Sequence, residues 1–561
     1  MSESTKPTFQ ATLGNSQSHS GTGTKSRPPP PIEEREYYEP PLEFGEVEDF
    51  RYYNRGGFHP VDIGDILNSR FEVIHKLGCG GFGIVWLCHD RDFNKWRAVK
   101  ILTADLSAES SNQEVKTLAY LRDQASGEKL ERNHIGVALE HFYIEGPNGR
   151  HLCFVMPVFG CSVSRWRSML NCEEESTVVA SRNICRQVAK GLRFLHSKGI
   201  AHGDLKPGNI LMRVDGIDDL DRSELGELLG EPDLEPMETT SGDDPRPWAP
   251  QYCVKPVSQT WCKRFLIEEV TIIDFGESFH VDSPKNSLGI PPAYAAPELI
   301  FPKTRALGFS SDVWALACVM FEIKTGDILF ENASRHDLDA TVREFELFLG
   351  PLPDPYRTAW KGQEHVLQAH ESASETGMLG GSGEPSSEAN AYASEDATAL
   401  LEETAEILAG AECSHVLEGT LVKERTVYRP LHPGDARSEP LHFRFPRNDA
   451  LMLADLLCAM LKYEPNDRMT SEEVCRHPWL GGKSRLQGIS DRLGASRVGD
   501  LLKGLIFVLV LSLSAIVLHA YATSPKDLRP HSSGILQGLC LPETALMERL
   551  GKEEGRGTRL D

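Results

Sequence analysis

The sequence predicts an α+β fold in which a β-rich part precedes a larger helical part. Residues 70–102 contain three β-rich runs, FEVIHKLG, IVWLCHD and WRAVKIL, separated by glycines and charged turns. Helical patterns follow, most clearly in VASRNICRQVAKGLRFLHSKG (179–199), which ends at a glycine suited to a helix C-terminus. The length of 561 residues is sufficient for two to four domains, or for one large domain with insertions.

Between residues 102 and 179 the sequence predicts one further helix and one further strand. Glu114, Leu118 and Leu121 fall on one face of a helix. The apolar run HLCFVMPVF (151–159) predicts another strand. Residues 1–50 are rich in Ser, Thr, Gly and Pro, which indicates a disordered arm, and we expect order to begin near Phe58.

The net charge of −23 is concentrated in two stretches of the chain. Residues 215–244 hold twelve acidic residues and one basic residue, and residues 364–412 hold eleven acidic residues and no Lys or Arg. Such composition predicts two largely disordered insertions. The acidic balance also argues against direct nucleic-acid binding by broad neutralisation of phosphates.

Cysteine usage and hydropathy bear on the compartment. The 13 cysteines include no CxxC pair, which favours reduced thiols in the cytosol or nucleus. Residues 504–523 form a candidate transmembrane helix, because no formal charge occurs from Gly504 to Pro525. Basic residues upstream of it would keep the bulk of the chain cytosolic, with residues 526–561 as a tail. The alternatives are a buried C-terminal helix or sequence wrongly appended by a gene model.

A glycine-rich turn and a strand lysine suggest a nucleotide phosphate site. Gly78, Gly80 and Gly83 are spaced so that a hairpin can lie over phosphates without Cβ clashes, and Val85 can cover a base. Lys100 follows in the next strand and can reach the phosphates if a carboxylate orients it. Glu114 is the preferred partner on helical phase, and Glu109 is the rival.

Two later segments supply candidate catalytic and magnesium-binding groups. In HGDLKPGN (202–209), Asp204 can accept a hydroxyl proton, Lys206 can neutralise the moving phosphoryl group, and Asn209 offers an oxygen ligand to Mg²⁺. In VTIIDFGES (270–278), a strand delivers Asp274 as the second magnesium ligand.

Three further residues are expected to support this site. Asp312 opens a hydrophobic helix, where its carboxylate can hold backbone amides of the catalytic loop. Arg468 is placed to pair with Glu298 of the AAPEL motif. The order of all these pieces is the protein-kinase pattern. It predicts a bilobal protein kinase fold with disordered insertions over residues 69–480, with an N-lobe at 69–160 and a C-lobe at 161–480. The insertions lie at about 213–267 and 362–440.

Within the protein kinases, the chain resembles the SR-protein kinases, which phosphorylate serines in arginine–serine repeats. The segment YYNRGGFHPVDIGDILNSRFEVIHKLG, the run HLCFVMPVFG and the run FEIKTGDILFE are each similar to that family. The resemblance implies ATP and Mg²⁺ as cofactors and a protein substrate that is basic or arginine–serine-rich. It also implies an adenine site with Met156 as gatekeeper and Pro157 to Phe159 as hinge, bounded by Leu77 and Ala98.

The chain departs from the usual motifs at several positions. Gly203 stands where many kinases carry the arginine that clamps a phosphorylated activation loop, so we expect activity without that phosphorylation. Pro291 and Ala295 replace the threonine and the arginine expected near the substrate. Ser278, Ser283 and Ser287 are either phosphosites or plain solvated loop serines.

The motifs therefore predict a protein kinase. Lys206 favours serine or threonine as the acceptor, because tyrosine kinases usually lack a lysine at this position. The alternative is a pseudokinase that serves as a scaffold without catalysis, and a tail-anchored membrane kinase is a further hypothesis about location. The oligomeric state is not predicted.

Overall fold

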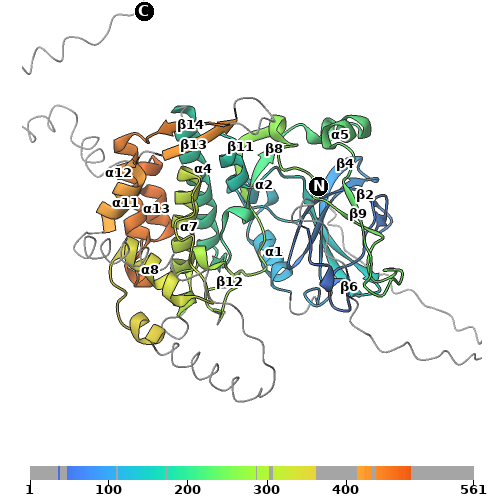
Figure 1. Ribbon diagram of the computed structural model, residues 1–561, viewed down its shortest axis with the longest axis horizontal. Coiled ribbons are helices and arrows are strands. Elements are labelled where there is room, and N and C mark those ends of the chain that lie inside the picture. Colours follow the sequence, from blue (N-terminus) through green and yellow to red (C-terminus); the bar gives the residue numbers. More distant parts are fainter. Residues whose placement is uncertain are drawn as a thin grey trace, which may run out of the picture. The chain divides into compact units, whose positions relative to one another are not determined.

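The computed structural model describes residues 36–37, 47–108, 112–170, 175–285, 287–301, 307–361, 413–423, 425–430 and 438–481. The chain divides into two compact units, Met1–Cys475 and Arg476–Asp561. The elements from β1 to α12, most of which are labelled in Figure 1, belong to the first unit. In the second unit the described part contains a short 3-10 helix, η8 (Pro478–Leu480).

The N-terminal part of the first unit is built on an antiparallel sheet of six strands, in the order β1-β2-β3-β4-β6-β5. The strands are β1 (Ile66–Leu67), β2 (Phe71–Gly80), β3 (Gly83–Asp90), β4 (Lys95–Leu102), β5 (Glu140–Gly146) and β6 (Gly149–Pro157). The strands predicted over residues 70–102 and 151–159 are therefore confirmed. Helices α1 (Gln113–Gln124) and α2 (Gly127–Arg132) connect β4 to β5, and Asn112 caps α1 by accepting from the Val115 amide.

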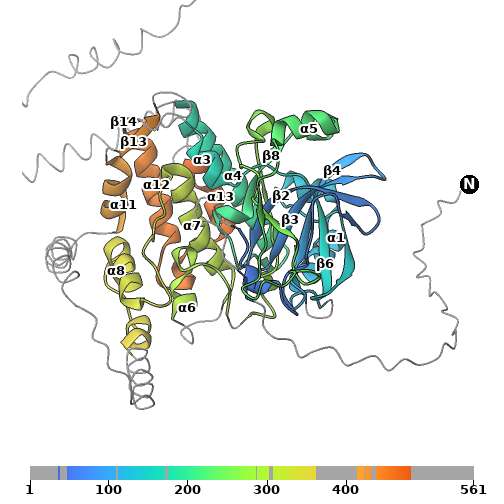
Figure 2. The same cartoon turned by 45° about the vertical axis from the view of Figure 1, so that its right-hand side comes forward.

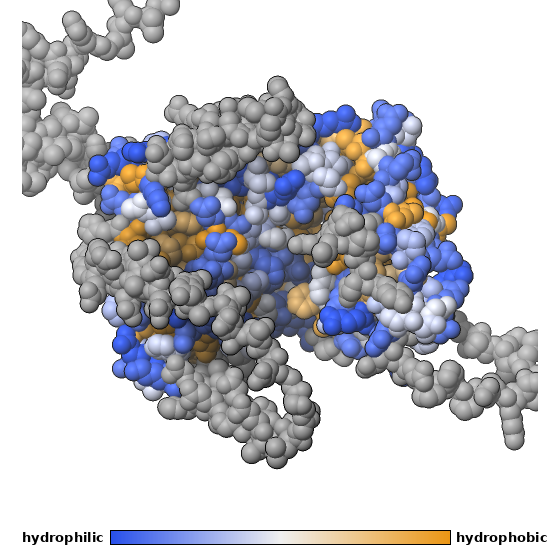
Figure 3. Space-filling view, in the orientation of Figure 1, coloured by the Kyte–Doolittle hydropathy of each residue, from blue (hydrophilic) through white to orange (hydrophobic). Residues whose placement is uncertain are grey.

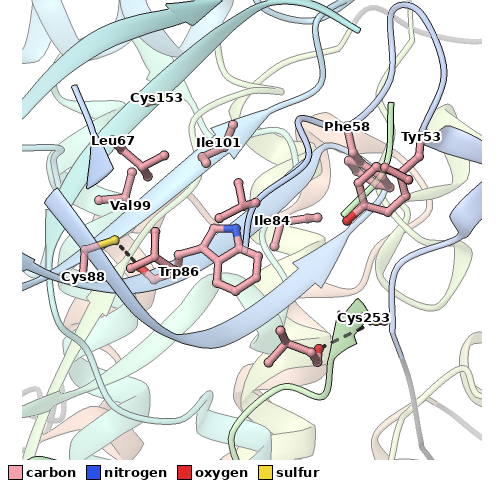
Figure 4. Packing of buried hydrophobic residues seen from close by; sticks show 14 of the residues in the cluster. Tyr53, Phe58, Leu67, Ile84, Trp86, Cys88, Val99, Ile101, Cys153 and Cys253 are labelled. Carbon is pink, nitrogen blue, oxygen red and sulfur yellow. Dashed lines mark hydrogen bonds between the residues drawn. The ribbon is translucent and has the colours of Figure 1, made fainter. Parts of the chain in front are cut away.

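The core of this sheet includes two segments that precede and follow the predicted lobe. One is the N-terminal segment, residues 47–64, which contributes Phe50, Tyr53 and Phe58. The other is the spacer, residues 213–267, from which Cys253 and Val254 pack into the same cluster. Figure 4 shows Tyr53 and Phe58 beside the strand residues, with Cys253 on a separate strand of the spacer. The sequence predicts ordered structure from about Phe58, but the described segment already starts at Val47. The earlier start is explained by the rings of Phe50 and Tyr53, which pack in the core.

A buried ion pair ties these segments together. Lys76 on β2 is fully buried and pairs with Glu48. Its ammonium also donates to the carbonyl of Val254 at 3.0 Å. Tyr53 donates its hydroxyl to Glu48 at 2.7 Å. A buried charge is tolerated only when it is paired and hydrogen-bonded, so the three segments depend on one another.

The spacer is folded, and the expected disorder over residues 215–244 is wrong. It contains α5 (Arg222–Leu229), β9 (Leu234–Pro236), β10 (Tyr252–Val254) and the start of β11 (Leu266–Ile272). The acidic side chains lie on the outside or make specific contacts: Asp221 caps α5 in a capping box with Glu224. Apolar residues between them are buried, and Ile217 and Leu225 pack in a cluster with β-strand residues. Figure 2 shows α5 on the side of the molecule where β4 lies.

The C-terminal part of the first unit is mostly helical. Its helices are α3 (Val163–Ser168), α4 (Glu175–His196), α6 (Pro297–Ile300), α7 (Phe309–Thr325), α8 (Leu338–Leu349), α11 (Cys413–Val422), α12 (Arg447–Met460) and α13 (Ser471–Arg476, reaching the second unit). Three pairs of short strands complete it: β7 (Ile200–Ala201) with β12 (Phe279–His280), β8 (Ile210–Val214) with β11, and β13 (Arg425–Pro430) with β14 (Ser438–Phe443). Helix α7 is buried over residues 311–325, which explains its hydrophobic sequence.

Three predicted features lie wholly or mainly outside the described residues. They are the acidic stretch 364–412 of the second insertion, most of the N-terminal arm, and the candidate transmembrane helix at 504–523 with the tail after it. The described residues of the second insertion, predicted at about 362–440, form α11, β13 and the start of β14. Among the described residues, no helix is long and apolar enough to cross a membrane. On the face drawn in Figure 3, hydrophilic residues predominate among the coloured atoms, with small hydrophobic patches between them.

Candidate active site

The glycine-rich turn is the β2–β3 hairpin. Gly80 pairs with Gly83 across the hairpin, and Gly78 pairs with Val85. At Gly83 a Cβ atom would lie 2.3 Å from the carbonyl oxygen of Ile101, so this close approach of β3 to β4 requires glycine. The exposed ring of Phe82 forms the tip of the hairpin.

Lys100 on β4 lies between two carboxylates. Its ammonium nitrogen is 3.3 Å from Glu114 Oε2 on α1 and 3.1 Å from Asp274 Oδ1. The structure thus brings Lys100 to Glu114, the residue preferred on helical phase, while Glu109 lies outside the described residues. Burial alone would lower the pKa of Lys100, but the two carboxylates hold that pKa above its ordinary value. Burial raises the pKa of Glu114 against the opposing effect of the Lys100 charge.

The catalytic loop brings Asp204, Lys206 and Asn209 together. Lys206 donates to Asp204 Oδ2 at 2.6 Å. The Asn209 side chain donates to the same oxygen and to the Asp204 carbonyl, both at 2.9 Å. The other carboxylate oxygen of Asp204 is buried and has no hydrogen-bond partner among the described residues. Burial raises the pKa of Asp204, so this free oxygen is suited to accept a proton.

Asp274 reaches the site from the end of β11 through an unusual backbone conformation. Its φ is +65°, in the left-handed region, which turns the carboxylate toward Lys100. Although burial acts in the other direction, the positive charge of Lys100 lowers the pKa of Asp274. The carboxylate therefore stays ionised, as a ligand to a divalent cation must.

Gly203 has a structural role that its place in the motif did not predict. Its φ is +79°, and a Cβ atom would lie 2.5 Å from the carbonyl oxygen of Glu277. The catalytic loop and the activation segment (residues 274–298) thus approach each other too closely for any side chain at position 203.

Asp312 contacts the catalytic loop, and Arg468 pairs with Glu298 of the activation segment. Asp312, at the start of α7, accepts from the amides of His202 at 2.7 Å and Gly203 at 2.9 Å. Arg468 binds Glu298 through two hydrogen bonds of 2.7 and 2.8 Å, and both side chains are fully buried. A planar guanidinium matches a carboxylate in this way, and the pair holds the end of the activation segment.

The hinge residues occupy the end of β6. Met156 pairs with Ala98 on β4, and Pro157 pairs with Arg97. Val158 is buried, whereas Pro157 and Phe159 are partly exposed. Leu77 packs at the edge of the cluster that contains Val158. The assignment of these residues to the adenine site stays a prediction.

A cavity of about 330 Å³ lies between Lys100, Asp204 and Asp274. It is lined by the tip of the glycine hairpin, by β4 and α1, and by the catalytic and activation segments, including Phe82, Lys100, Glu114, Asp204, Asp274 and Lys285. The carboxylates of Asp204 and Asp274 and the buried ammonium of Lys100 line this cavity, and they fit a nucleotide phosphate bound with Mg²⁺. Asn209 is not part of the lining but is hydrogen-bonded to Asp204. Lys100 and the hairpin would hold phosphates, and Asn209 and Asp274 would hold the metal.

Two residues that the sequence analysis did not predict, Arg335 and Lys285, make contacts with the activation segment. Arg335 donates to the carbonyls of Leu288 at 3.1 Å and Ile290 at 3.0 Å. Lys285 pairs with Glu277 at 3.1 Å. Neither residue belongs to a motif, so no signal in the sequence pointed to them.

The loop serines of the activation segment differ in their surroundings. Ser278 is fully buried, so it is not a solvated loop serine, while Ser283 and Ser287 are exposed.

The two-lobed arrangement and this site define a protein kinase. The protein kinase domain family matches residues 71–220 and 263–480, and the chain belongs to that family. The interruption of the match at 221–262 falls within the folded spacer.

Within this family, the chain is similar to SR-protein kinases and related kinases. It is 39% identical to SRSF protein kinase 3 of Homo sapiens over 171 residues, which is 30% of each chain. It is 25% identical to serine/threonine-protein kinase SRPK of Physarum polycephalum over 452 residues, 78% of this chain and 91% of that one. Protein kinase dsk1 of Schizosaccharomyces pombe is 35% identical over 174 residues, 30% of this chain and 31% of that one. In the relatives that are 39% identical, the chain spans only 15% to 30% of their length.

Proposed function

We propose that this chain is an active serine/threonine protein kinase that transfers the γ-phosphoryl group of ATP to protein hydroxyls. The observation that carries the proposal is the convergence of Lys100, Asp204 and Asp274 on one cavity. The pairing of Lys100 with Glu114 and the free buried oxygen of Asp204 support catalysis over the alternative of a scaffold. The names of the relatives, which include serine/threonine-protein kinases, support the same reaction class.

The roles follow from chemistry and geometry. The free oxygen of Asp204 would orient and accept the proton of the substrate hydroxyl. Lys206, bound to the other oxygen, would neutralise charge on the phosphoryl group in transfer. Asn209 and Asp274 would hold Mg²⁺, which would supply positive charge to offset the negative charge of the phosphates. Catalysis would thus come mainly from positioning and charge neutralisation.

We further propose that the activation segment holds its own conformation without phosphorylation. Gly203 leaves no arginine to bind a phosphate at that position. The segment is instead fastened by Arg335 to two backbone carbonyls and by Lys285 to Glu277.

The substrate is proposed to be a basic, serine-containing protein segment. The relatives named SRSF protein kinase favour this class. The residues expected near the substrate differ from those of the SR-protein kinases, however. Ala295 stands where those kinases carry an arginine, and it is fully buried. A degenerate peptide library would define the preference directly.

Residues 504–523 are proposed to anchor the chain to a membrane.

Replacing Asp204 by asparagine tests the catalytic proposal. The amide keeps the shape but cannot accept the proton, so we expect kcat to fall by about 10²- to 10⁴-fold. The measurement is transfer of radiolabelled phosphate from ATP to a basic, serine-rich protein, with Asp282→Asn on the exposed surface as the control. Equal incorporation by wild type and Asp204→Asn would refute catalysis at this site.

A further inference from the structure

A buried hydrogen bond joins α1 to the activation segment outside the kinase motifs. Ser278 Oγ and Thr117 Oγ1 lie 2.7 Å apart. Ser278 is completely buried, and Thr117 is 2% exposed. A pair of hydroxyls withdrawn from water this completely is costly unless both are satisfied.

The direction of the hydrogen bonds can be derived from their partners. The Ser278 hydroxyl donates to the carbonyl of Phe275 at 2.7 Å. A hydroxyl has a single proton to donate, so Ser278 must be the acceptor in its contact with Thr117. Thr117 in turn accepts from the side chain of Gln113 at 3.2 Å. The result is one chain of donors that runs from Gln113 through Thr117 and Ser278 to Phe275.

This chain of hydrogen bonds passes close to both partners of Lys100. Thr117 follows Glu114 by three residues, which places both on the same face of α1. Phe275 directly follows Asp274. A rotation or shift of α1 that moved Glu114 away from Lys100 would therefore also move Thr117 away from Ser278.

We propose that Thr117 and Ser278 are positioning residues that hold α1 so that Glu114 reaches Lys100. The inference rests on the proposed kinase function and adds to it the contact that keeps the ion pair formed. It also assigns Ser278 a role that excludes its modification in this conformation, because a phosphate would break both hydrogen bonds and has no space in a fully buried site.

The test uses matched variants that remove or keep the hydroxyl. Ser278→Ala and Thr117→Val each delete one hydroxyl and leave its partner unsatisfied, so we expect kcat to fall about five- to tenfold. Thr117→Ser keeps the hydroxyl and is expected to stay within twofold of wild type. Ser283→Ala, on the exposed part of the same segment, serves as control. Because both deletions break the same bond, the double variant is expected to be no worse than the poorer single variant.

Two readouts separate this inference from the proposed function. Hydrogen–deuterium exchange over residues 113–121 reports the anchoring of α1 without any catalysis, and we expect faster exchange in Ser278→Ala and Thr117→Val. If wild type transfers phosphate but both deletion variants match it in kcat and exchange, the positioning role is overturned. If wild type transfers no phosphate, the proposed function fails, while unchanged exchange in the variants would still overturn the inference by itself.

Discussion

Gly203 illustrates how one residue can be set by its surroundings and not by its motif alone. In the catalytic loop it stands where an arginine is common, which suggests only that a regulatory contact is missing. In the folded protein its φ of +79° and the nearby Glu277 carbonyl leave no room for a Cβ atom. An arginine at position 203 is therefore incompatible with the observed contact between the catalytic loop and the activation segment.

Restoring a side chain at this position is expected to be harmful. Gly203→Arg should lower the free energy of unfolding by about 1–3 kcal/mol, since a left-handed backbone and a steric overlap are both imposed. We also expect kcat to fall, because Asp204 is the next residue in the loop. Chemical denaturation and the phosphate-transfer assay measure the two effects.

A glycine with free space provides the comparison. A Cβ atom added at Gly226 in α5 would meet no other atom within 4 Å, so Gly226→Ala should leave stability equal or slightly higher. Unchanged stability and activity in Gly203→Arg would contradict the close approach described for this loop.

At the scale of elements, the spacer and the N-terminal segment behave as parts of the N-lobe. Strand β10 supplies the Val254 carbonyl that accepts from Lys76, and β2, which carries Lys76, continues directly into the glycine hairpin. The elements outside the common kinase pattern therefore stabilise the strand that would cover the phosphates.

Removing part of the spacer should consequently weaken the N-lobe. We expect replacement of residues 231–256 by a short glycine–serine linker to lower the free energy of unfolding by at least about 4 kcal/mol. The change strips Met237, Ala249, Cys253 and Val254 from the core, at roughly 1–3 kcal/mol for each large side chain. Thermal denaturation followed by circular dichroism measures the change.

Leu234→Ser is the matched control within the same segment, because Leu234 is 46% exposed. It should leave the melting temperature nearly unchanged. If the deletion variant had the same melting temperature as wild type, the spacer would be dispensable for the fold.

At the scale of the whole molecule, the net charge of −23 is uneven and its meaning depends on structure. The acidic residues at 215–244 belong to a folded surface, where Asp218 pairs with Lys95 at 2.9 Å and Asp221 caps a helix. Acidic composition alone does not distinguish such a surface from a disordered segment, because both keep their charges in water.

The location of the whole protein is a separate question that residues 504–523 raise. We expect full-length protein to sediment with membranes and a variant lacking residues 501–525 to remain soluble, because an uncharged stretch of about 20 residues can cross a bilayer. Fractionation with a carbonate wash measures this. Full-length protein found in the soluble fraction would contradict the membrane anchor.

The local parts of the site were predictable because catalysis demands particular residues at short spacings. Asp204, Lys206 and Asn209 lie within six residues of one loop, so their proximity follows from the chain itself. Glu114 was also found, since helical phase places it on the face that includes Leu118 and Leu121. The contacts of Arg335, Lys285 and Ser278 were not predictable, because each joins segments whose proximity depends on tertiary folding.

The sequence by itself determined the reaction class, the identity of the candidate catalytic groups and the order of lobes, since these depend on local motifs and on periodicity. Tertiary structure decided three other matters: that the acidic spacer is folded, that Gly203 cannot carry a side chain, and that Ser278 is a buried tie to α1. In each case the deciding quantity is a contact between distant segments. Such contacts depend on which apolar and polar groups meet in the core. The composition of the chain does not show which distant residues will meet.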